Sequence, residues 1–448
     1  MASFHPSELA QWTSGTWLED SQAEEVCGFS FDARKIQSGD CFIALTVGQR
    51  DGHDYVEQAI GGGAVAALVE RPLQLAIPQL VVADTLLAME AIASVVRSRF
   101  TSTVIGVTGS CGKTSTKEML LHLLGSEETH ATEGNWNNRI GVPMTLFGLH
   151  ESPKSAAVVE AGINQPGEMS HLGRMIEADL VIVTHIGPAH LEKLGSLDGI
   201  AAEKSLLMEQ AKESAQLILP ASAYSHEAFA SFAERAIVVA ESDEVVAGRP
   251  NRIVRYQVED GSIRIKELFG EMSFAVATHS SGIRSNAALA LVAASTLDVP
   301  GEILKKRLQA WHPSENRGRL VDRDGRLCYL DCYNANPASM ADALAAFSEA
   351  VPRDVARCYV LGAMNELGSE EEGLHTEAVE GLSLRAEDLV CLVGSAKLRA
   401  AYRAGLEASE DQVHEAESAE SIQSVVASFS GALFFKGSRS FALEQLIR

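Results

Sequence analysis

The sequence predicts an α/β protein of three domains, and three observations support this prediction. The chain has 448 residues, which at roughly 150 residues per domain favours about three domains. Apolar residues make up 46% and charged residues 22%, so several cores can be filled and global disorder is excluded. Apolar runs alternate with helical stretches in two separate parts of the chain, as they do in doubly wound parallel sheets.

Residues 1–100 are expected to form a small N-terminal α/β domain. Short β-like runs occur at CFIAL (41–45) and AALVE (66–70), and the glycines at 61–63 separate them. Such runs bounded by turn residues are typical of strands.

Residues 101–308 are expected to form a central domain with a mostly parallel sheet. TVIGVT (103–108) reads as a strand, a Gly-rich turn follows, and KEMLLHLLG (117–125) has the apolar spacing and terminal glycine of a helix. AAVVEAG (156–162) and DLVIVTHIG (179–187) are continuous apolar runs, which indicates parallel strands covered on both faces.

Residues 309–448 are expected to form a third, doubly wound domain, because the alternation restarts near residue 327. The predicted strands are LCYLD, CYVLG, DLVCLVG and ALFFKG, with a helix at ASMADALAAFSEAV, a helical stretch to about 385 and a last helix after ALFFKG.

The net charge excludes several classes of partner. Lysine and arginine number 37 against 60 aspartates and glutamates, a formal charge of −23. This field repels nucleic acid and anionic membranes. Any phosphate ligand must therefore be bound by local backbone amides and a few placed cations.

The cysteines and the N-terminus favour a cytoplasmic protein. The seven cysteines include no CxxC pair, so neither a disulfide framework nor a zinc site is indicated. The first residues lack a signal-peptide pattern, and no apolar stretch approaches the ~18 residues of a membrane span.

A partial phosphate-binding loop follows the predicted strand at 103–108. Its pattern is that of a P-loop except that Val107 stands where the strict motif has glycine. Backbone amides of such a loop approach phosphate oxygens at a helix N-terminus, the lysine supplies a cation, and the next hydroxyl binds Mg²⁺. The alternative is a Gly-rich turn with an incidental lysine. The candidate nucleotide-binding residues are Gly109, Ser110, Cys111, Gly112, Lys113, Thr114 and Ser115.

Two further candidates lie where predicted parallel strands end, the edge at which open α/β sheets bind ligands. Glu160 ends one strand and offers the oxygen that Mg²⁺ prefers. His190 follows the strand that ends near His185 and could coordinate a cation or orient water. Taken alone, His185 and His190 are each more readily interpreted as structural or surface residues.

Several ordered motifs resemble the Mur ligase family, the ATP-dependent amide-forming enzymes of peptidoglycan precursor synthesis. The resemblance covers nearly the whole chain and implies a UDP-binding N-terminal domain, a central ATPase domain and a C-terminal Rossmann-like domain. The motifs are TEGNWNNRIGVPMTL (132–146), EAGINQPGEMSHL (160–172), GPAHLEKLGSLDGIAAEK (187–204), DCYNANPASM (331–340), LGAMNELG (361–368) with His375, and KGSR (436–439).

The resemblance also implies a reaction and its substrates. The carboxylate of UDP-N-acetylmuramoyl-tripeptide attacks the γ-phosphate of ATP, and the amine of D-alanyl-D-alanine then attacks the acyl phosphate. The products are an amide, ADP and phosphate. A monomer is expected, with no nucleic-acid partner and no integral membrane association.

For the metal site, the resemblance implies that Thr114 and Glu160 hold one Mg²⁺ and that Glu160 and His190 share a second. Lys204 matches the family lysine that is carbamylated, a reaction that needs a deprotonated amine. Without the spacing from His190, Lys204 would read as a solvated helix lysine.

Around the nucleotide, Asn286 resembles the asparagine near the adenine, but Ser285 and Leu289 depart from the family pattern. Arg319 matches the arginine that reaches the γ-phosphate, with Arg317 as the alternative. Asp331 matches the ribose-contacting or hinge aspartate, and Asn334 of the same motif is assigned to the nucleotide.

The substrate residues are matched less directly. Asn137 and Asn138 are expected where phosphate and peptide meet, or else they only form a turn. Arg34 is expected at the UDP end, although Ala33 replaces a usual serine. Lys436 and Arg439 either bind the dipeptide carboxylate or flank a strand–helix turn.

Three alternatives remain. The sister ligase that adds a diamino acid carries a DNPR signature, whereas this chain has DCYNANP at that turn. A ligase that adds glutamate to folate fits the NNRIG and NELG segments poorly. A nucleotide-binding regulator without catalysis would not need Lys113, Glu160, His190 and Lys204 together.

Overall fold

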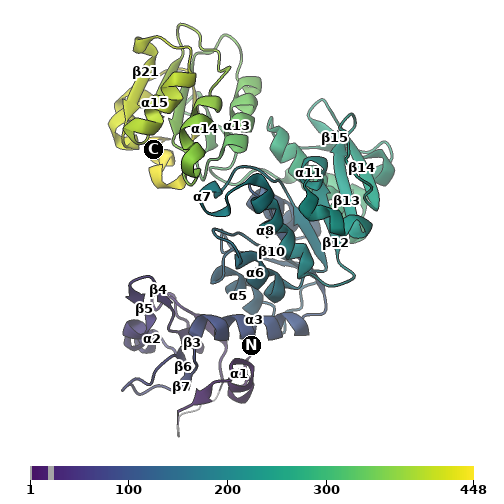
Figure 1. Ribbon diagram of the computed structural model, residues 1–448, viewed down its shortest axis with the longest axis vertical. Coiled ribbons are helices and arrows are strands. Elements are labelled where there is room, and N and C mark those ends of the chain that lie inside the picture. Colours follow the sequence, from purple (N-terminus) through teal and green to yellow (C-terminus); the bar gives the residue numbers. More distant parts are fainter. Residues whose placement is uncertain (1–2, 19–24, 448) are drawn as a thin grey trace.

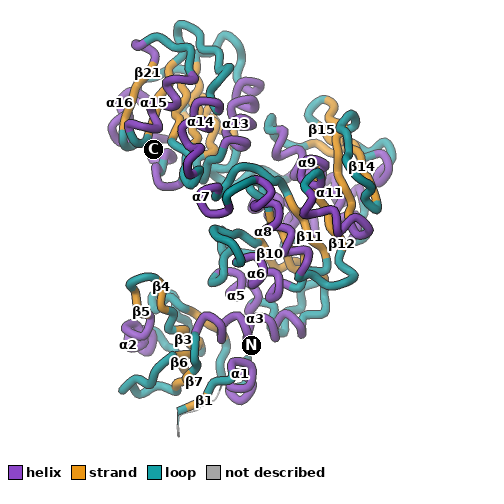
Figure 2. Tube along the Cα trace, viewed as in Figure 1, coloured by secondary structure: helices purple, strands orange, loops and turns teal. Residues whose placement is uncertain are grey.

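The computed structural model describes residues 3–18 and 25–447, and it has three units of mixed helix and sheet along one long axis (Figure 1). The N-terminal unit lies at one end, the unit that carries α11 and β10–β15 lies in the middle, and the C-terminal unit lies at the other end. Helices flank the strands in each unit (Figure 2). The expected α/β class with mostly parallel sheets is confirmed.

The N-terminal sheet has five strands in the order β1-β7-β6-β3-β2, and only β1 runs antiparallel to its neighbour. The predicted runs 41–45 and 66–70 correspond to β3 and β6. The elements are α1 Pro6–Thr13, β1 Thr16–Trp17, β2 Gly28–Ser30, β3 Asp40–Ile43, β4 Thr46–Val47, β5 Arg50–Asp51, α2 Val56–Gly61, β6 Ala66–Val69, β7 Gln79–Val81 and α3 Thr85–Arg99.

Helix α3 joins this unit to the next. The buried Arg97 donates from Nε to the carbonyl of Ile176 at 2.7 Å and from Nη2 to Asp179 Oδ2 at 2.9 Å. One continuous apolar cluster runs from Phe4 to Ala240 and includes residues of both units. The expected boundary at residue 100 therefore follows a helix that packs on the central unit.

The central sheet has nine strands in the order β16-β15-β14-β13-β12-β11-β8-β10-β9, parallel except for the β14-β15-β16 edge. The predicted strand 103–108 coincides with β8. The strands β12–β16 were not predicted. The elements are β8 Thr103–Thr108, α4 Lys113–Leu124, β9 Thr129–Ala131, α5 Gly141–Phe147, β10 Ala156–Glu160, α6 Glu168–Ile176, β11 Leu180–Val183, α7 Leu191–Leu194, α8 Leu197–Glu209, β12 Gln216–Pro220, α9 Ala221–Tyr224, β13 Ala236–Glu241, β14 Arg252–Glu259, β15 Ser262–Arg264, α10 Lys266–Phe269, β16 Ser273–Ala275, α11 Ser281–Thr296 and α12 Gly301–Ala310.

The C-terminal sheet has six strands in the order β17-β18-β22-β19-β20-β21, with only β17 antiparallel. Two apolar clusters pack on its opposite faces. The elements are β17 Arg319–Arg323, β18 Arg326–Asp331, α13 Pro337–Ala350, β19 Arg357–Gly362, α14 Glu371–Glu377, β20 Leu389–Val393, α15 Ala396–Gly405, β21 Val413–Ala416, α16 Gln423–Ser428 and β22 Ala432–Lys436, and the chain then ends in short 3₁₀ turns.

Within the described ranges 3–18 and 25–447, no helix combines the length and the apolar character needed to cross a bilayer.

Candidate active site

The loop between β8 and α4 has the backbone shape of a phosphate cradle. Gly109 has φ +151° and Gly112 has φ +81°, both values that L side chains rarely adopt. A Cβ on Gly109 would lie 2.0 Å from Thr184 Oγ1, and one on Gly112 would lie 2.7 Å from the amide of Asn286. Glycine is therefore required at both positions, and α4 begins directly afterwards.

Lys113 is the first residue of α4, and its Nζ donates to the carbonyl of Gly109 at 2.8 Å. Burial lowers the pKa of this ammonium group, while the carboxylate of Glu160 opposes that shift. The lysine thus spans the loop that a polyphosphate would occupy.

Glu160 links the phosphate loop to the segment of Asn137. Its Oε1 accepts from the Thr114 hydroxyl at 3.2 Å and from Asn137 Nδ2 at 2.6 Å. Its Oε2 is buried without a hydrogen-bond partner. A buried, unpartnered carboxylate oxygen is costly, and beside a hydroxyl it has the chemistry of a Mg²⁺ ligand. These residues therefore fit the expected cation.

His190 connects the central and C-terminal units. It caps α7 with φ +56°, and its Nδ1 lies 2.5 Å from Oε2 of Glu366. Burial lowers the pKa of the imidazole, Glu366 opposes that shift, and the charges of Lys113 and Lys204 add to it. No group of three His, Cys, Asp or Glu residues suited to a metal occurs within the described chain, so His190 is not part of a preformed cluster.

Lys204 lies on α8 and is 2% exposed. Burial, followed by the charge of Lys113, lowers the pKa of its amine well below the usual value. Among the residues that the structure describes, no hydrogen-bond or ion-pair partner of its Nζ occurs. Both effects favour the neutral form of the amine, which is the nucleophilic one.

The C-terminal unit supplies the opposite wall. Lys436 Nζ lies 2.6 Å from Asp331 Oδ2 and also donates to the carbonyl of Asn334 at 3.1 Å. Burial raises the pKa of Asp331 and the ammonium of Lys436 opposes that rise. Lys436 is thus engaged in fixing the 331–334 turn, because its strand β22 lies next to β18.

The structure distinguishes between the two candidate arginines. Arg317 lines the cavity, and its guanidinium stacks on the ring of Tyr333 at 3.7 Å. Arg319 begins β17 and is not among the described residues that line the cavity. Gly318, with φ +79°, turns the chain between them.

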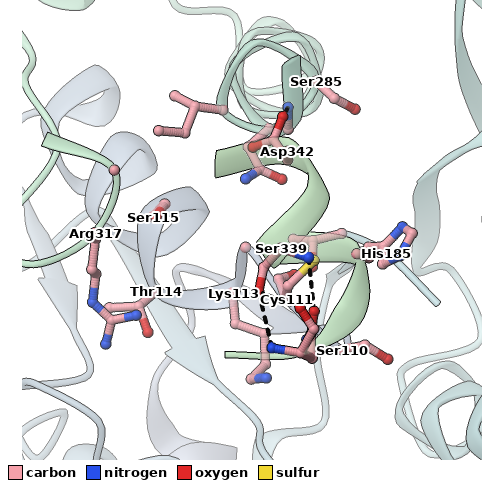
Figure 3. Close-up of a pocket in the computed structure, with 18 of the residues that line it drawn as sticks. Ser110, Cys111, Lys113, Thr114, Ser115, His185, Ser285, Arg317, Ser339 and Asp342 are labelled. Carbon is pink, nitrogen blue, oxygen red and sulfur yellow. Dashed lines mark hydrogen bonds between the residues drawn. The ribbon is translucent and has the colours of Figure 1, made fainter. Parts of the chain in front are cut away.

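A cavity of about 650 Å³ lies between these walls, within the size range of ligand pockets. Figure 3 shows the start of α4 with Lys113, Thr114 and Ser115, and around it Arg317, Asp342 and His185. The predicted residues that line the cavity are Ser110, Cys111, Gly112, Lys113, Thr114, Ser115, Asn137, Glu160, His190, Asn286, Asp331, Asn334 and Lys436.

Three predicted substrate residues lie elsewhere. Asn138 Oδ1 accepts from the backbone amides of residues 140 and 141, which is the turn-forming alternative. Arg34 is exposed and paired with Asp32 at 2.8 Å. Arg439 is exposed and paired with Glu444 at 2.5 Å. None of the three lies in the cavity.

The sequence matches two models of one protein family. Residues 107–294 match the Mur ligase middle domain, and residues 316–438 match the Mur ligase, glutamate ligase domain. A UDP-N-acetylmuramoyl-tripeptide--D-alanyl-D-alanine ligase of Bacillus subtilis is 32% identical over 98% of this chain and 96% of its own. The chain belongs to the Mur ligase family.

Further relatives support this membership. The enzyme of the same description from Escherichia coli is 32% identical over 93% of this chain and 92% of its own. The crystal structure of MurF from Acinetobacter baumannii matches with a TM-score of 0.86 and 28% identity, covering 99% of this chain and 98% of that one. The expected three-domain fold of the Mur ligases is thereby confirmed.

Sequence reasoning missed several residues of this Mur ligase cavity. Asp342 on α13, Tyr256 on β14 and Thr184 after β11 all line it. Asp342 lies in a helix with an ordinary amphipathic pattern, and Tyr256 lies on β14, which was not predicted. The sequence therefore gave no indication that either residue belongs to the site. Thr184 stood within a predicted strand and could have been found from its place at the carboxyl end.

Proposed function

We propose that this chain is an ATP-dependent ligase that joins D-alanyl-D-alanine to UDP-N-acetylmuramoyl-tripeptide in peptidoglycan precursor synthesis. The observation that carries the proposal is the cavity in which the phosphate loop, the unpartnered Glu160 oxygen and the 331–334 turn face one another. Near full-length identity of 32% to relatives described as this ligase supports the choice of substrates.

The reaction begins when the terminal carboxylate of the tripeptide attacks the γ-phosphorus of ATP and ADP leaves. The amine of D-alanyl-D-alanine then attacks the acyl carbon, phosphate leaves, and the amine loses a proton as the amide forms. Two anions must approach in the first step, so cations have to offset their repulsion. Lys113 and Arg317 line the cavity as such cations.

Thr114 and Glu160 would hold Mg²⁺, and His190, which is paired with Glu366, lines the same cavity. When bound, Mg²⁺ neutralises charge on the phosphates and on the attacking carboxylate. Asn137, through its hydrogen bond to Glu160, orients the carboxylate that serves this role.

We assign Arg317 to the γ-phosphate in preference to Arg319, because Arg317 lies in the cavity. Asn286 and Asp331 are proposed for the nucleoside, and Arg34 for the UDP end of the substrate. For Lys204 we propose addition of CO₂ to the neutral amine, which gives a carbamate and releases a proton. The lowered pKa of Lys204 supports this step.

Phosphate release and product mass test the proposal. With ATP, Mg²⁺ and UDP-N-acetylmuramoyl-tripeptide, phosphate should be released only when D-alanyl-D-alanine is added, and one pentapeptide should form per phosphate. If UDP-N-acetylmuramoyl-dipeptide and a diamino acid were ligated as fast as the tripeptide and D-alanyl-D-alanine, the result would support the sister ligase instead. An inert protein, or release without acceptor, would contradict the proposal.

A further inference from the structure

A carboxylate of the C-terminal unit contacts the first turn of a central helix. Asp342 on α13 accepts from the Ser280 hydroxyl at 2.5 Å through Oδ2. Its Oδ1 accepts from the Ser281 hydroxyl at 2.8 Å and from the Gly282 amide at 3.0 Å. Figure 1 shows α13 on the side of its unit that faces α11. Three donors from one turn thus converge on a single side chain.

This contact completes the cap of α11. The Ser280 side chain caps the 16-residue helix from within by accepting from the Ile283 amide at 2.9 Å. The remaining amides of a first turn lack partners, and a negative charge is favoured there. Asp342 therefore supplies, from another unit, the acceptor oxygens and negative charge that helix N-termini usually obtain from neighbouring residues.

The two helices carry opposite walls of the cavity. Asn286, about one turn into α11, lies against Gly112 of the phosphate loop. Helix α13 directly follows the turn that bears Asp331 and Asn334. Fixing α13 on α11 therefore fixes the 331–334 turn relative to the phosphate loop.

We propose that Asp342 is a positioning residue that sets the spacing of the two nucleotide-binding walls by capping α11 across the units. This inference uses the proposed function for its ATP readout. Two physical effects of removing Asp342 oppose each other. Loss of a negative charge would by itself strengthen ATP binding, whereas loss of the spacing would weaken it. The direction in which KM for ATP changes therefore shows which of the two effects dominates.

Steady-state kinetics on purified full-length variants test the sign. Asp342→Ala should raise KM for ATP about tenfold, within the usual range of coupling between sites, and should change kcat less. Asp342→Asn should be intermediate, because an amide keeps one acceptor oxygen. A KM for ATP that falls or stays unchanged in Asp342→Ala would overturn the proposal.

Glu349→Ala is the matched control on the same helix. Glu349 pairs with His279 at 3.2 Å and with Arg284 at 3.3 Å, but its side chain is 56% exposed. Exposed pairs contribute little, so KM for ATP should change less than twofold. If Glu349→Ala raised KM for ATP as much as Asp342→Ala does, the effect would come from charge at the interface in general. That result would overturn the specific role of Asp342 as a cap.

A double-mutant cycle and hydrogen exchange complete the test. Ser281→Ala should raise KM in the same direction, and its effect should be less than additive with Asp342→Ala. Amide exchange at residues 281–284 should accelerate in Asp342→Ala while exchange in α4 stays unchanged. The measurement of hydrogen exchange does not need ligase activity. An inactive wild-type protein would therefore refute the proposed ligase function and still allow the cap formed by Asp342 to be tested.

Additive effects of the two substitutions on KM, or unchanged exchange at residues 281–284, would refute the role of Asp342 as a cap. If Asp342→Ala fails to fold, Ser281→Ala provides the same test.

Discussion

Two lysines that were predicted for the site, Lys113 and Lys204, illustrate what single residues contribute. Burial lowers the pKa of both Lys113 and Lys204. Lys113 keeps an opposing carboxylate, Glu160, and a carbonyl acceptor on Gly109. Lys204 has another cation as its strongest charged neighbour. The surroundings of Lys113 therefore include groups that favour its charged form, whereas the surroundings of Lys204 favour the neutral amine.

Lys113→Ala is expected to reduce turnover at least ~100-fold, the usual loss when one charge-stabilising donor is removed. The folded structure should persist, because Lys113 contacts a loop carbonyl and not the core. Phosphate release and thermal unfolding check both parts. Lys193→Ala, a change at an exposed lysine in the central unit, serves as control. Wild-type turnover in Lys113→Ala would remove the lysine from the mechanism.

Lys204→Met is expected to abolish turnover and raise the free energy of unfolding near neutral pH, measured in CO₂-free buffer. The folded pKa of Lys204 lies below its unfolded value of about 10.4. Between these values the unfolded chain binds more protons, so wild-type stability rises with pH. The advantage of methionine should therefore shrink as pH approaches 10.

Denaturant unfolding at several pH values measures this difference. Lys305→Met, at an exposed lysine on α12, should show no such trend. A Lys204→Met protein less stable than wild type at pH 7 would contradict the reasoning, because it would mean that the buried amine stabilises the fold.

The residues found from sequence were those tied to a strand end. Thr114 lies just after the loop that follows β8, and Glu160 ends the neighbouring parallel strand β10, so both were expected at the same edge of the sheet. The Lys436–Asp331 pair depends on β22 lying beside β18, some 100 positions away in sequence, and no local pattern reports that. Arg317 could not be separated from Arg319 because the turn at Gly318 decides which one faces the cavity.

At the scale of elements, the strongly patterned run at 103–108 was predicted and weakly patterned strands were missed, although the apolar strands β12 and β13 were missed as well. The run 103–108 matched β8 because a buried parallel strand is apolar throughout. In β14 buried and exposed positions are mixed, and β15 and β16 have only three residues each, too few to show a period. The antiparallel edge was missed for that reason.

Helix α3 provides the prediction at this scale. Arg97→Met should lower the free energy of unfolding by about 3 kcal/mol, because it leaves three carbonyls and part of Asp179 unpaired in a buried junction. Arg99→Met on the same helix should cost less than about 1 kcal/mol, since Arg99 is 48% exposed and pairs with Glu8 at the surface. Urea unfolding of both variants measures the difference, and equal losses would contradict the assigned role of the junction.

At the scale of the whole molecule, the units are joined in different ways. The N-terminal and central units share an apolar cluster. Several described contacts between the central and C-terminal units are polar, including His190–Glu366 and those of Asp342 and Glu349. Polar contacts exchange with water at small net cost, so we expect ligands to alter the position of the C-terminal unit more readily than that of the N-terminal unit.

The net charge of −23 gives a prediction that no single residue carries. ATP and the UDP-linked tripeptide are both anions, so the long-range field opposes their approach, while Lys113 and Arg317 act only within the cavity. Raising ionic strength from about 10 to 150 mM shortens the Debye length from about 30 to 8 Å and screens the distant charges far more than the buried ones. At saturating Mg²⁺, kcat/KM for ATP should therefore rise severalfold across this range, whereas kcat/KM for the zwitterionic D-alanyl-D-alanine should stay nearly constant. A fall in kcat/KM for ATP with salt would mean that local cations control the encounter, because attraction is the interaction that screening weakens.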